Sequence, residues 1–162
     1  MSNVVRDAER FSSITEELLR QGNAVRFRAS GVSMKPFIRD GDLLTVMPAR
    51  TDSLRTGDVI FYNSSNNDIT AHRVVAICNQ EGERVFLVRG DATGGPFENI
   101  TAEQILGRVA GIHRGNRWIP TGAPHYRFPP VAWAHIQTLR RQTRIGASRI
   151  KRRVLNALGT RK

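Results

Sequence analysis

The chain has 162 residues, 25 Lys and Arg against 14 Asp and Glu, and one cysteine. This length predicts one domain with a small appendage, and the single Cys78 excludes an internal disulfide framework. No apolar run approaches the roughly 20 residues of a membrane-spanning helix, and charged residues occupy the N-terminus where a secretory signal would be apolar. We therefore expect a cytoplasmic protein, and because no His or Cys spacing suggests a metal site, we expect no cofactor or metal.

The first element predicted along the chain is a helix over residues 7–20. Its apolar residues fall on one helical stripe, and Gly22-Asn23 is a plausible stop. The stripe consists of Phe11, Ile14, Leu18 and Leu19. We expect this helix, within a segment 1–23, to pack on the body of the protein.

Short alternating or apolar runs follow, separated by turn residues, over residues 24–119. Val25 and Phe27 alternate with Arg26 and Arg28, which is typical of a strand with one buried face. The other predicted strands are residues 43–47, 59–62, 72–77, 84–89 and 105–113. Together they predict a mainly β protein built around an antiparallel β domain.

The C-terminal part differs in composition from this body. Four prolines in residues 120–130 predict a linker, and residues 131–162 are predicted to be a basic amphipathic helical tail. Residues 1–125 hold 15 basic and 14 acidic residues, whereas residues 126–162 hold ten basic and no acidic ones. An amphipathic basic helix favours peripheral contact with an anionic membrane, with nucleic acid as the alternative partner.

The order of three short segments suggests a serine hydrolase. Ser33 lies in Ser30-Gly31-Val32-Ser33-Met34-Lys35-Pro36, and His72 and Asp91 follow in later segments. A serine hydroxyl is a poor nucleophile until a nearby base takes its proton. Lys35 is only two residues from Ser33 in the same short segment, and the other lysines, Lys151 and Lys162, lie in the last dozen residues. His72 is therefore the leading candidate for the base.

These segments resemble the serine peptidases that include signal peptidase I and the self-cleaving repressors of the LexA type, the S24/S26 group. Gly31 to Pro36 resembles the nucleophile segment, and residues 40–46 and 54–61 resemble the boxes that follow it. His72-Arg73-Val74-Val75 is similar to the Ser–His signal peptidase variant, in which histidine replaces lysine. Arg89-Gly90-Asp91-Ala92 and residues 107–109 resemble the last boxes. The resemblance covers residues 25–112, and we expect no N-terminal transmembrane anchor of the kind that typical signal peptidases carry.

The resemblance implies a signal-peptidase/LexA-like β domain and a serine endopeptidase that cleaves a leader or signal-like segment. Ser33 would attack the peptide carbonyl, His72 would act as base, and Asp91 would hold His72 in the right tautomer. Glu98 lies where the family often has a second acid, so either Asp91 or Glu98 could support His72. Gly31 replaces a serine that bacterial signal peptidases use in the oxyanion site, so backbone N–H groups, including that of Ser33, would serve.

The resemblance also implies that the substrate peptide or protein binds as an extended strand. The alternative function is a non-catalytic or regulatory LexA-like module. Such a module would bind a protein partner, or nucleic acid through the basic tail.

Overall fold

The fold is given by a computed structural model, which describes residues 13–64, 68–92, 95–124 and 126–127. Its first element is a helix through residues 13–20, the described part of the predicted helix. Leu19 on this helix is buried in the core, whereas the side chains of Ile14 and Leu18 are 60% and 38% exposed. The described part of the helix therefore contacts the body through Leu19, and Ile14 and Leu18 of its apolar stripe are not covered.

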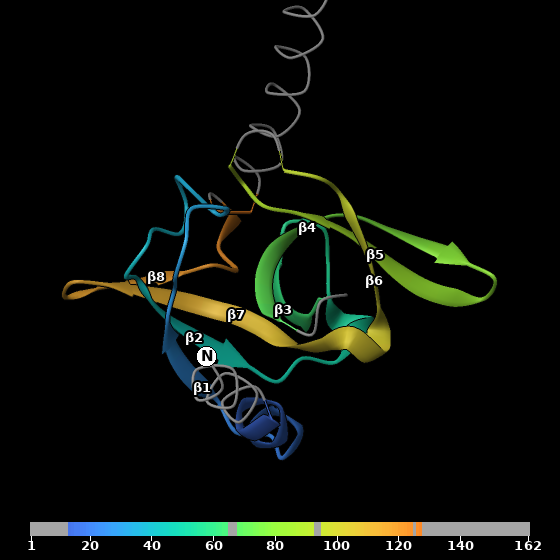
Figure 1. Cartoon of the computed structure of the whole chain (residues 1–162), viewed down its shortest axis with the longest axis horizontal. Coiled ribbons are helices and arrows are strands. Elements are labelled where there is room, and N and C mark those ends of the chain that lie inside the picture. Colours follow the sequence, from blue (N-terminus) through green and yellow to red (C-terminus); the bar gives the residue numbers. More distant parts are fainter. Residues whose placement is uncertain (1–12, 65–67, 93–94, 125, 128–162) are drawn as a thin grey trace, which may run out of the picture.

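The body is a single sheet of eight antiparallel strands, labelled in Figure 1. The strand order is β1-β2-β7-β3-β4-β5-β6, and β8 pairs with β7. The strands are β1 (Val25–Arg28), β2 (Leu43–Met47), β3 (Val59–Asn63), β4 (Ile69–Gln80), β5 (Glu83–Arg89), β6 (Glu98–Thr101), β7 (Ile105–Arg114) and β8 (Arg117–Pro120). Two short 3-10 turns, Thr51–Ser53 and Ala102–Gln104, join strands. The predicted mainly antiparallel β class is confirmed.

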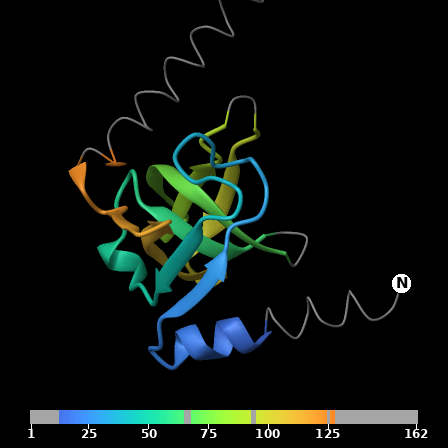
Figure 2. The ribbon, with the colours of Figure 1, turned by 90° about the vertical axis from the view of Figure 1, so that its left-hand side faces the viewer.

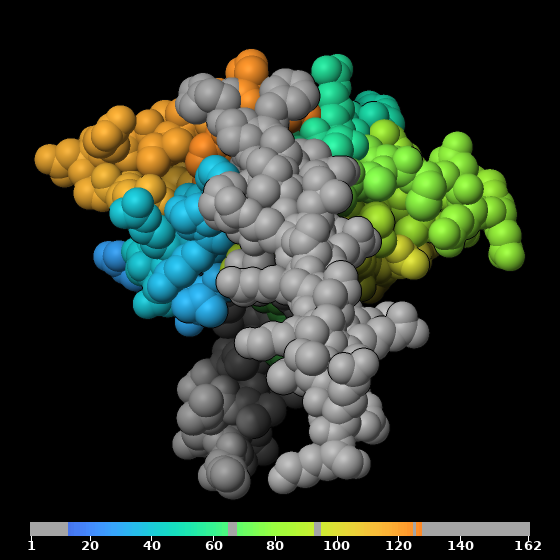
Figure 3. Space-filling model, turned by 90° about the horizontal axis from the view of Figure 1, so that it is seen from above, coloured from blue at the N-terminus to red at the C-terminus, as the bar shows by residue number. Residues whose placement is uncertain are grey.

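Two strands were not predicted from the sequence. The strands β6 and β8 have four residues each, and runs of that length show little periodicity. The strand β4 is also longer than predicted, because it begins at Ile69 and forms a long hairpin with β5. In Figure 3 the green tip of this hairpin lies on the opposite side of the molecule from the light-blue residues that follow β1.

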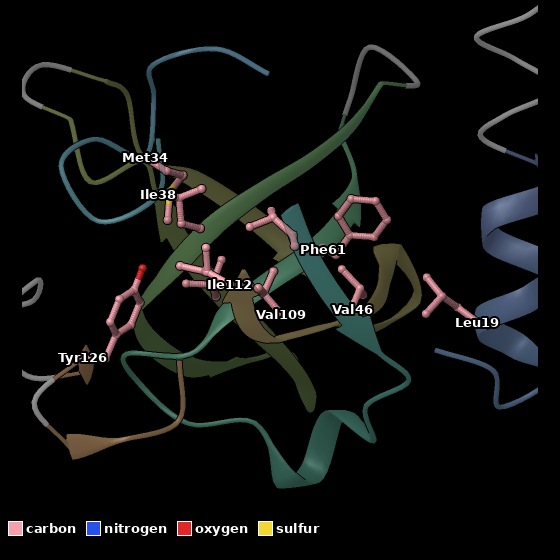
Figure 4. Packing of buried hydrophobic residues seen from close by; sticks show 10 residues of the cluster. Leu19, Met34, Ile38, Val46, Phe61, Val109, Ile112 and Tyr126 are labelled. Carbon is pink, nitrogen blue, oxygen red and sulfur yellow. The ribbon is translucent and has the colours of Figure 1, made fainter. Parts of the chain in front are cut away.

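The sheet curls so that apolar residues are buried on both of its faces (Figures 1 and 2). One cluster includes Met34, Ile38, Phe61 and Ile112, several of which are labelled in Figure 4. The other is built around residues such as Ile60, Tyr62 and Phe86. Because neighbouring strand residues point to opposite faces, Phe61 enters the first cluster while Ile60 and Tyr62 enter the second.

The end of the body lies further along the chain than the sequence indicated. Residues 120–130 were predicted to form a linker, yet Thr121 and Tyr126 are buried at 3% and 7% exposure. Tyr126 joins the first apolar cluster, where Figure 4 shows it beside Ile112. The packed body therefore continues to at least Tyr126, because an aromatic ring among prolines can still fill a core position. The predicted tail, residues 131–162, lies outside the described residues.

Within the described part of the chain, no helix combines the length and apolar character that crossing a bilayer requires.

Candidate active site

Ser33 lies in a tight turn that follows β1, and not in a strand. The Lys35 N–H donates to the Val32 carbonyl at 3.1 Å and the Ile38 N–H to the Met34 carbonyl at 2.9 Å. Met34 and Ile38 are buried in the first apolar cluster, whereas Ser33 is exposed. The turn therefore anchors two apolar side chains in the core and leaves the Ser33 hydroxyl accessible. We call residues 31–38 the nucleophile turn, after the predicted role of Ser33.

The backbone of Ser33 is fixed against the segment that follows β5. The Ala92 N–H donates to the Ser33 carbonyl oxygen at 2.7 Å. Gly90 also approaches closely, because a Cβ atom at this position would lie 2.5 Å from the same oxygen. A side chain at position 90 would push the two segments apart, so glycine is required there for contact.

His72 lies on β4, opposite Ile60 of β3. Its Nδ1 atom is 2.9 Å from the Tyr62 hydroxyl and 3.2 Å from Oε1 of Glu98 on β6. A carboxylate beside Nδ1 favours the tautomer with the proton on that nitrogen, which leaves the Nε2 lone pair free to accept a proton. The surroundings of His72 therefore suit a general base that works through Nε2.

Burial dominates the electrostatics of this cluster. It lowers the pKa of His72 below the ordinary histidine value, while the negative charge of Glu98 opposes that shift. It also raises the pKa of Tyr62, so Tyr62 stays neutral and can take part in hydrogen bonds with both His72 and Glu98. The cluster keeps His72 neutral and ready to act as a base at neutral pH.

Asp91 contacts Arg73 and not His72. The Arg73 guanidinium donates to both Asp91 carboxylate oxygens, at 2.8 and 2.7 Å, and both side chains are at most 3% exposed. Burial raises the pKa of Asp91, and Arg73 opposes that rise. The contact with His72 that the sequence led us to expect from Asp91 is made by Glu98. His72 and Arg73 are neighbours on one strand and point to opposite faces of the sheet, which separates their partners.

Arg73 also connects the other parts of the site. It donates to the Gly57 carbonyl at 2.7 Å, and its guanidinium carbon lies 5.7 Å from the ring centre of Phe37 in the nucleophile turn. The ring of Tyr126 lies 5.4 Å away from the same carbon, and the Tyr126 hydroxyl donates to the Phe37 carbonyl at 2.9 Å. Arg73 and Tyr126 therefore join the nucleophile turn to the strand that carries His72.

Among the described residues, no hydrogen bond joins the side chains of Ser33 and His72, and the two residues are connected through other residues. The connection runs from Ser33 to Ala92, from the adjacent Asp91 to Arg73, and from Arg73 to its neighbour His72. Catalytic hydrogen bonds are often long in a free enzyme and shorten when substrate binds.

A groove of about 220 Å³ opens beside Ser33. The end of β1 with the residues after it forms one wall, and Ile69, Thr70 and Ala71 at the start of β4 form another. Apolar side chains such as Phe27, Met34 and Phe61 also line it. A groove with apolar side chains in its lining, next to an exposed serine, can hold part of a peptide.

Both walls of this groove carry unpaired strand edges. The N–H and carbonyl of Ala29 both bond to residues 41 and 42 before β2, so the backbone groups of Arg28 and Ser30 point away from β2. Val74 bonds to residues 57 and 58 before β3, so the backbone of Ala71 points away from β3. Pairing of β4 with β5 begins only at Arg73. Two strand edges therefore line the groove with backbone groups that point away from their strand partners among the described residues.

Two residues of the site were not assigned a role from the sequence, namely Tyr62 and Arg73. Each is a polar residue inside an apolar strand run, and that pattern could have indicated a buried side chain with a polar partner. A charged residue in such a run is buried only when it is paired, and a buried tyrosine usually finds a hydrogen-bond partner. Among the described residues, no group of His, Cys, Asp or Glu side chains is arranged to hold a metal ion.

A family model described as Peptidase S24-like matches residues 2–110 of the chain, about two thirds of its length. The matched range includes Ser33, His72, Asp91 and Glu98, and it ends before β8 and Tyr126. No curated protein matches the chain significantly.

Proposed function

The chain belongs to the Peptidase S24-like family, and we propose that it is a serine endopeptidase with Ser33 as nucleophile and His72 as general base. The observation that carries this proposal is the environment of His72. Its Nδ1 lies 3.2 Å from Oε1 of Glu98, so a proton held on Nδ1 leaves the Nε2 lone pair free to accept another proton. A serine–histidine pair requires such an imidazole, with one nitrogen held protonated by an acidic residue and the other able to take the serine proton.

In the proposed reaction the Ser33 hydroxyl attacks the peptide carbonyl carbon, and Nε2 of His72 takes the hydroxyl proton. The proton then passes to the leaving amine, and a water molecule hydrolyses the acyl-enzyme by the reverse sequence of proton transfers. Glu98 and Tyr62 hold the His72 ring, and Glu98 stabilises its charged form. The Ser33 N–H makes no hydrogen bond to a described residue, so it is free to bind the oxyanion.

Asp91 has a different task in this proposal. With Arg73 it fixes the segment 90–92, against which the Ser33 backbone rests. It therefore acts as a positioning residue for the nucleophile, and its charge adds a longer-range attraction for protonated His72.

The two free strand edges favour a substrate that binds as an extended segment between β1 and β4. Main-chain hydrogen bonds to both edges would hold the peptide next to Ser33. A leader or signal-like segment is the substrate class that this mode suits. Ten basic residues in the region 126–162 would attract the protein to an anionic membrane, with nucleic acid as the alternative partner.

Labelling with a fluorescent serine-directed phosphonate tests the proposal. We expect the wild-type chain to be labelled, and Ser33→Ala and His72→Ala to lose both labelling and peptide cleavage while keeping the folded circular dichroism spectrum. The double variant should be hardly worse than either single one, because residues that act as a unit are not additive. Ser53→Ala serves as the matched control, since the Ser53 hydroxyl caps a turn by donating to the Arg50 carbonyl at 2.7 Å.

A folded wild-type chain that is not labelled and cleaves no peptide would instead favour the regulatory, non-catalytic module.

A further inference from the structure

The side chains of β1 divide into an apolar row and a basic row. Val25 and Phe27 are half-buried against the first apolar cluster. Arg26 and Arg28 alternate with them and are exposed, so they point away from the core. A peptide strand beside β1 would follow the same alternation, with every second side chain on the outer face next to these arginines.

The rim of the groove is basic. Arg28 and Arg39 both line the groove, and no Asp or Glu does. The Arg28 side chain makes one hydrogen bond to a described residue, to the Gly41 carbonyl at 3.2 Å, and its other guanidinium N–H groups make none within that part of the chain. The side chains of Arg26 and Arg39 make no hydrogen bond or ion pair with any described residue.

The nearest acidic side chains do not neutralise this rim. Asp42 is bound by Arg114 through two contacts, at 2.9 and 2.6 Å. Asp40 accepts the Gly31 N–H at 2.9 Å and lies beside a second hollow that it shares with Lys35 and Arg39. The positive charges at the rim therefore exceed the negative ones.

From these observations we propose that the groove selects an extended peptide with Asp or Glu at its outward-facing positions, recognised by Arg28 with Arg26 and Arg39. The inference rests on the proposed function, because it names the substrate class for the same site. Inward-facing positions meet the apolar groove and should take small or apolar residues. Outward-facing positions meet the arginines, where an opposite charge on the adjacent strand stabilises the pair and a like charge destabilises it.

The test uses three synthetic peptides with small residues at the inward-facing positions. They differ only at the outward-facing positions, which carry Asp, Asn or Lys. Cleavage by the full chain is followed by mass spectrometry, and binding to the Ser33→Ala variant is followed by fluorescence anisotropy. We expect kcat/KM and affinity to fall in the order Asp, Asn, Lys, by about two- to fivefold for each step. The differences should shrink at 1 M salt, where the Debye length is about 3 Å.

Charge reversal in the protein provides the matched comparison. Arg28→Glu should reverse the preference between the Asp and Lys peptides, whereas Arg117→Glu should leave it unchanged. Arg117 is exposed on β8 and does not line the groove. The readout is the ratio between peptides, so a general loss of activity does not affect it.

The outcomes separate the two proposals. Equal cleavage and equal binding of the three peptides would overturn the acidic preference and leave the peptidase intact. Tighter binding of the Asp peptide to Ser33→Ala without cleavage by the wild-type chain would support the acidic preference and contradict the peptidase. If Arg28→Glu weakens binding to anionic phospholipid vesicles without changing the peptide ratio, the arginines serve a membrane contact and the proposal is wrong.

Discussion

Ser33 and His72 are held in place by different kinds of structure. His72 lies within β4, where pairing with β3 fixes its position and direction. Ser33 lies in a turn without ladder pairing, and its position depends on a few contacts from distant parts of the chain. The Ala92 N–H bonds the Ser33 carbonyl, while Arg114 and Tyr126 both donate to the Phe37 carbonyl at 2.9 Å.

This difference teaches that the position of His72 is set by sheet register and the position of Ser33 by long-range contacts. Substitutions near His72 should change its chemistry and leave the fold nearly intact. Substitutions among the contacts that hold the nucleophile turn should change stability or the placement of Ser33. The following predictions test that division, beginning with the largest expected effect.

Arg73→Met should cause the largest loss of stability. It removes one partner of a buried ion pair and leaves the Asp91 charge unpaired, which costs about 3–5 kcal/mol in the free energy of unfolding. Denaturant unfolding of the wild type and variant measures the loss. Arg50→Met is the control, because Arg50 forms an ion pair with Asp52 on the surface, where such pairs contribute little. Equal losses in the free energy of unfolding for the two variants would show that the Arg73 contacts do not hold the surrounding segments together.

Glu98→Gln should lower kcat/KM by about 100-fold with little change in unfolding, because the amide cannot stabilise the charged imidazole and no longer enforces one tautomer. Asp91→Asn should instead lower the free energy of unfolding more than Glu98→Gln does and lower kcat/KM less, because it leaves the Arg73 charge unpaired. Steady-state kinetics and denaturant unfolding of both variants make the comparison, with Glu103→Gln at an exposed site as control. If Asp91→Asn instead unfolds like the wild type and has the larger fall in kcat/KM, Asp91 is the acid that supports His72.

The position at which the chain is truncated should decide whether activity survives. A chain that ends at residue 127 keeps Tyr126, and we expect it to cleave a short peptide normally while losing salt-sensitive binding to anionic vesicles. A chain that ends at residue 125 loses the ring beside Arg73 and the hydrogen bond to Phe37, so cleavage should fall.

Tyr126→Phe isolates the hydroxyl in this comparison. Loss of that single hydrogen bond should cost about 1 kcal/mol and reduce kcat several-fold with KM nearly unchanged, since the ring still fills the core. Peptide cleavage and vesicle co-sedimentation of the three forms provide the measurements. Normal cleavage by the chain ending at residue 125 would place Tyr126 outside the working site.

The acidic limb of kcat/KM should lie below the ordinary histidine pKa of about 6.5, because burial lowers the pKa of His72. Glu98→Gln should move the limb further toward acid, since the Glu98 charge raises the His72 pKa.

The free energy of unfolding should also depend on the protonation of His72. It should fall as pH drops from about 6.5 through the lower pKa of folded His72, because the unfolded chain takes up the proton at a higher pH than the folded chain does. His72→Gln should flatten this dependence, and a limb above the ordinary value in the wild type would contradict the prediction.

Several features of the fold and site could be predicted from local patterns. Alternation in residues 25–28 and the apolar runs with Gly-Asp turns correctly indicated an antiparallel β protein, because period-two burial is a property of the strand itself. The family resemblance rested on the same kind of local information. It is confirmed at the level of the Peptidase S24-like family, and the likeness to the Ser–His signal peptidase variant stays a prediction. The catalytic roles of Ser33 and His72 stay predictions until the variants are measured.

The partners of the acidic residues and the end of the body could not be predicted in this way. Asp91 and Glu98 are both close enough along the chain to serve His72, and the sequence left the choice open. Pairing of β6 with β5 and the opposite directions of His72 and Arg73 decided it, since one residue of register changes the face of the sheet. Tyr126 likewise lies in a proline-rich segment that the sequence predicts to be a linker, and only the packed core shows that its ring is buried. The sequence determines which residues alternate along each strand, but only the packed sheet determines which side chains meet across it, because those contacts join segments far apart in the chain.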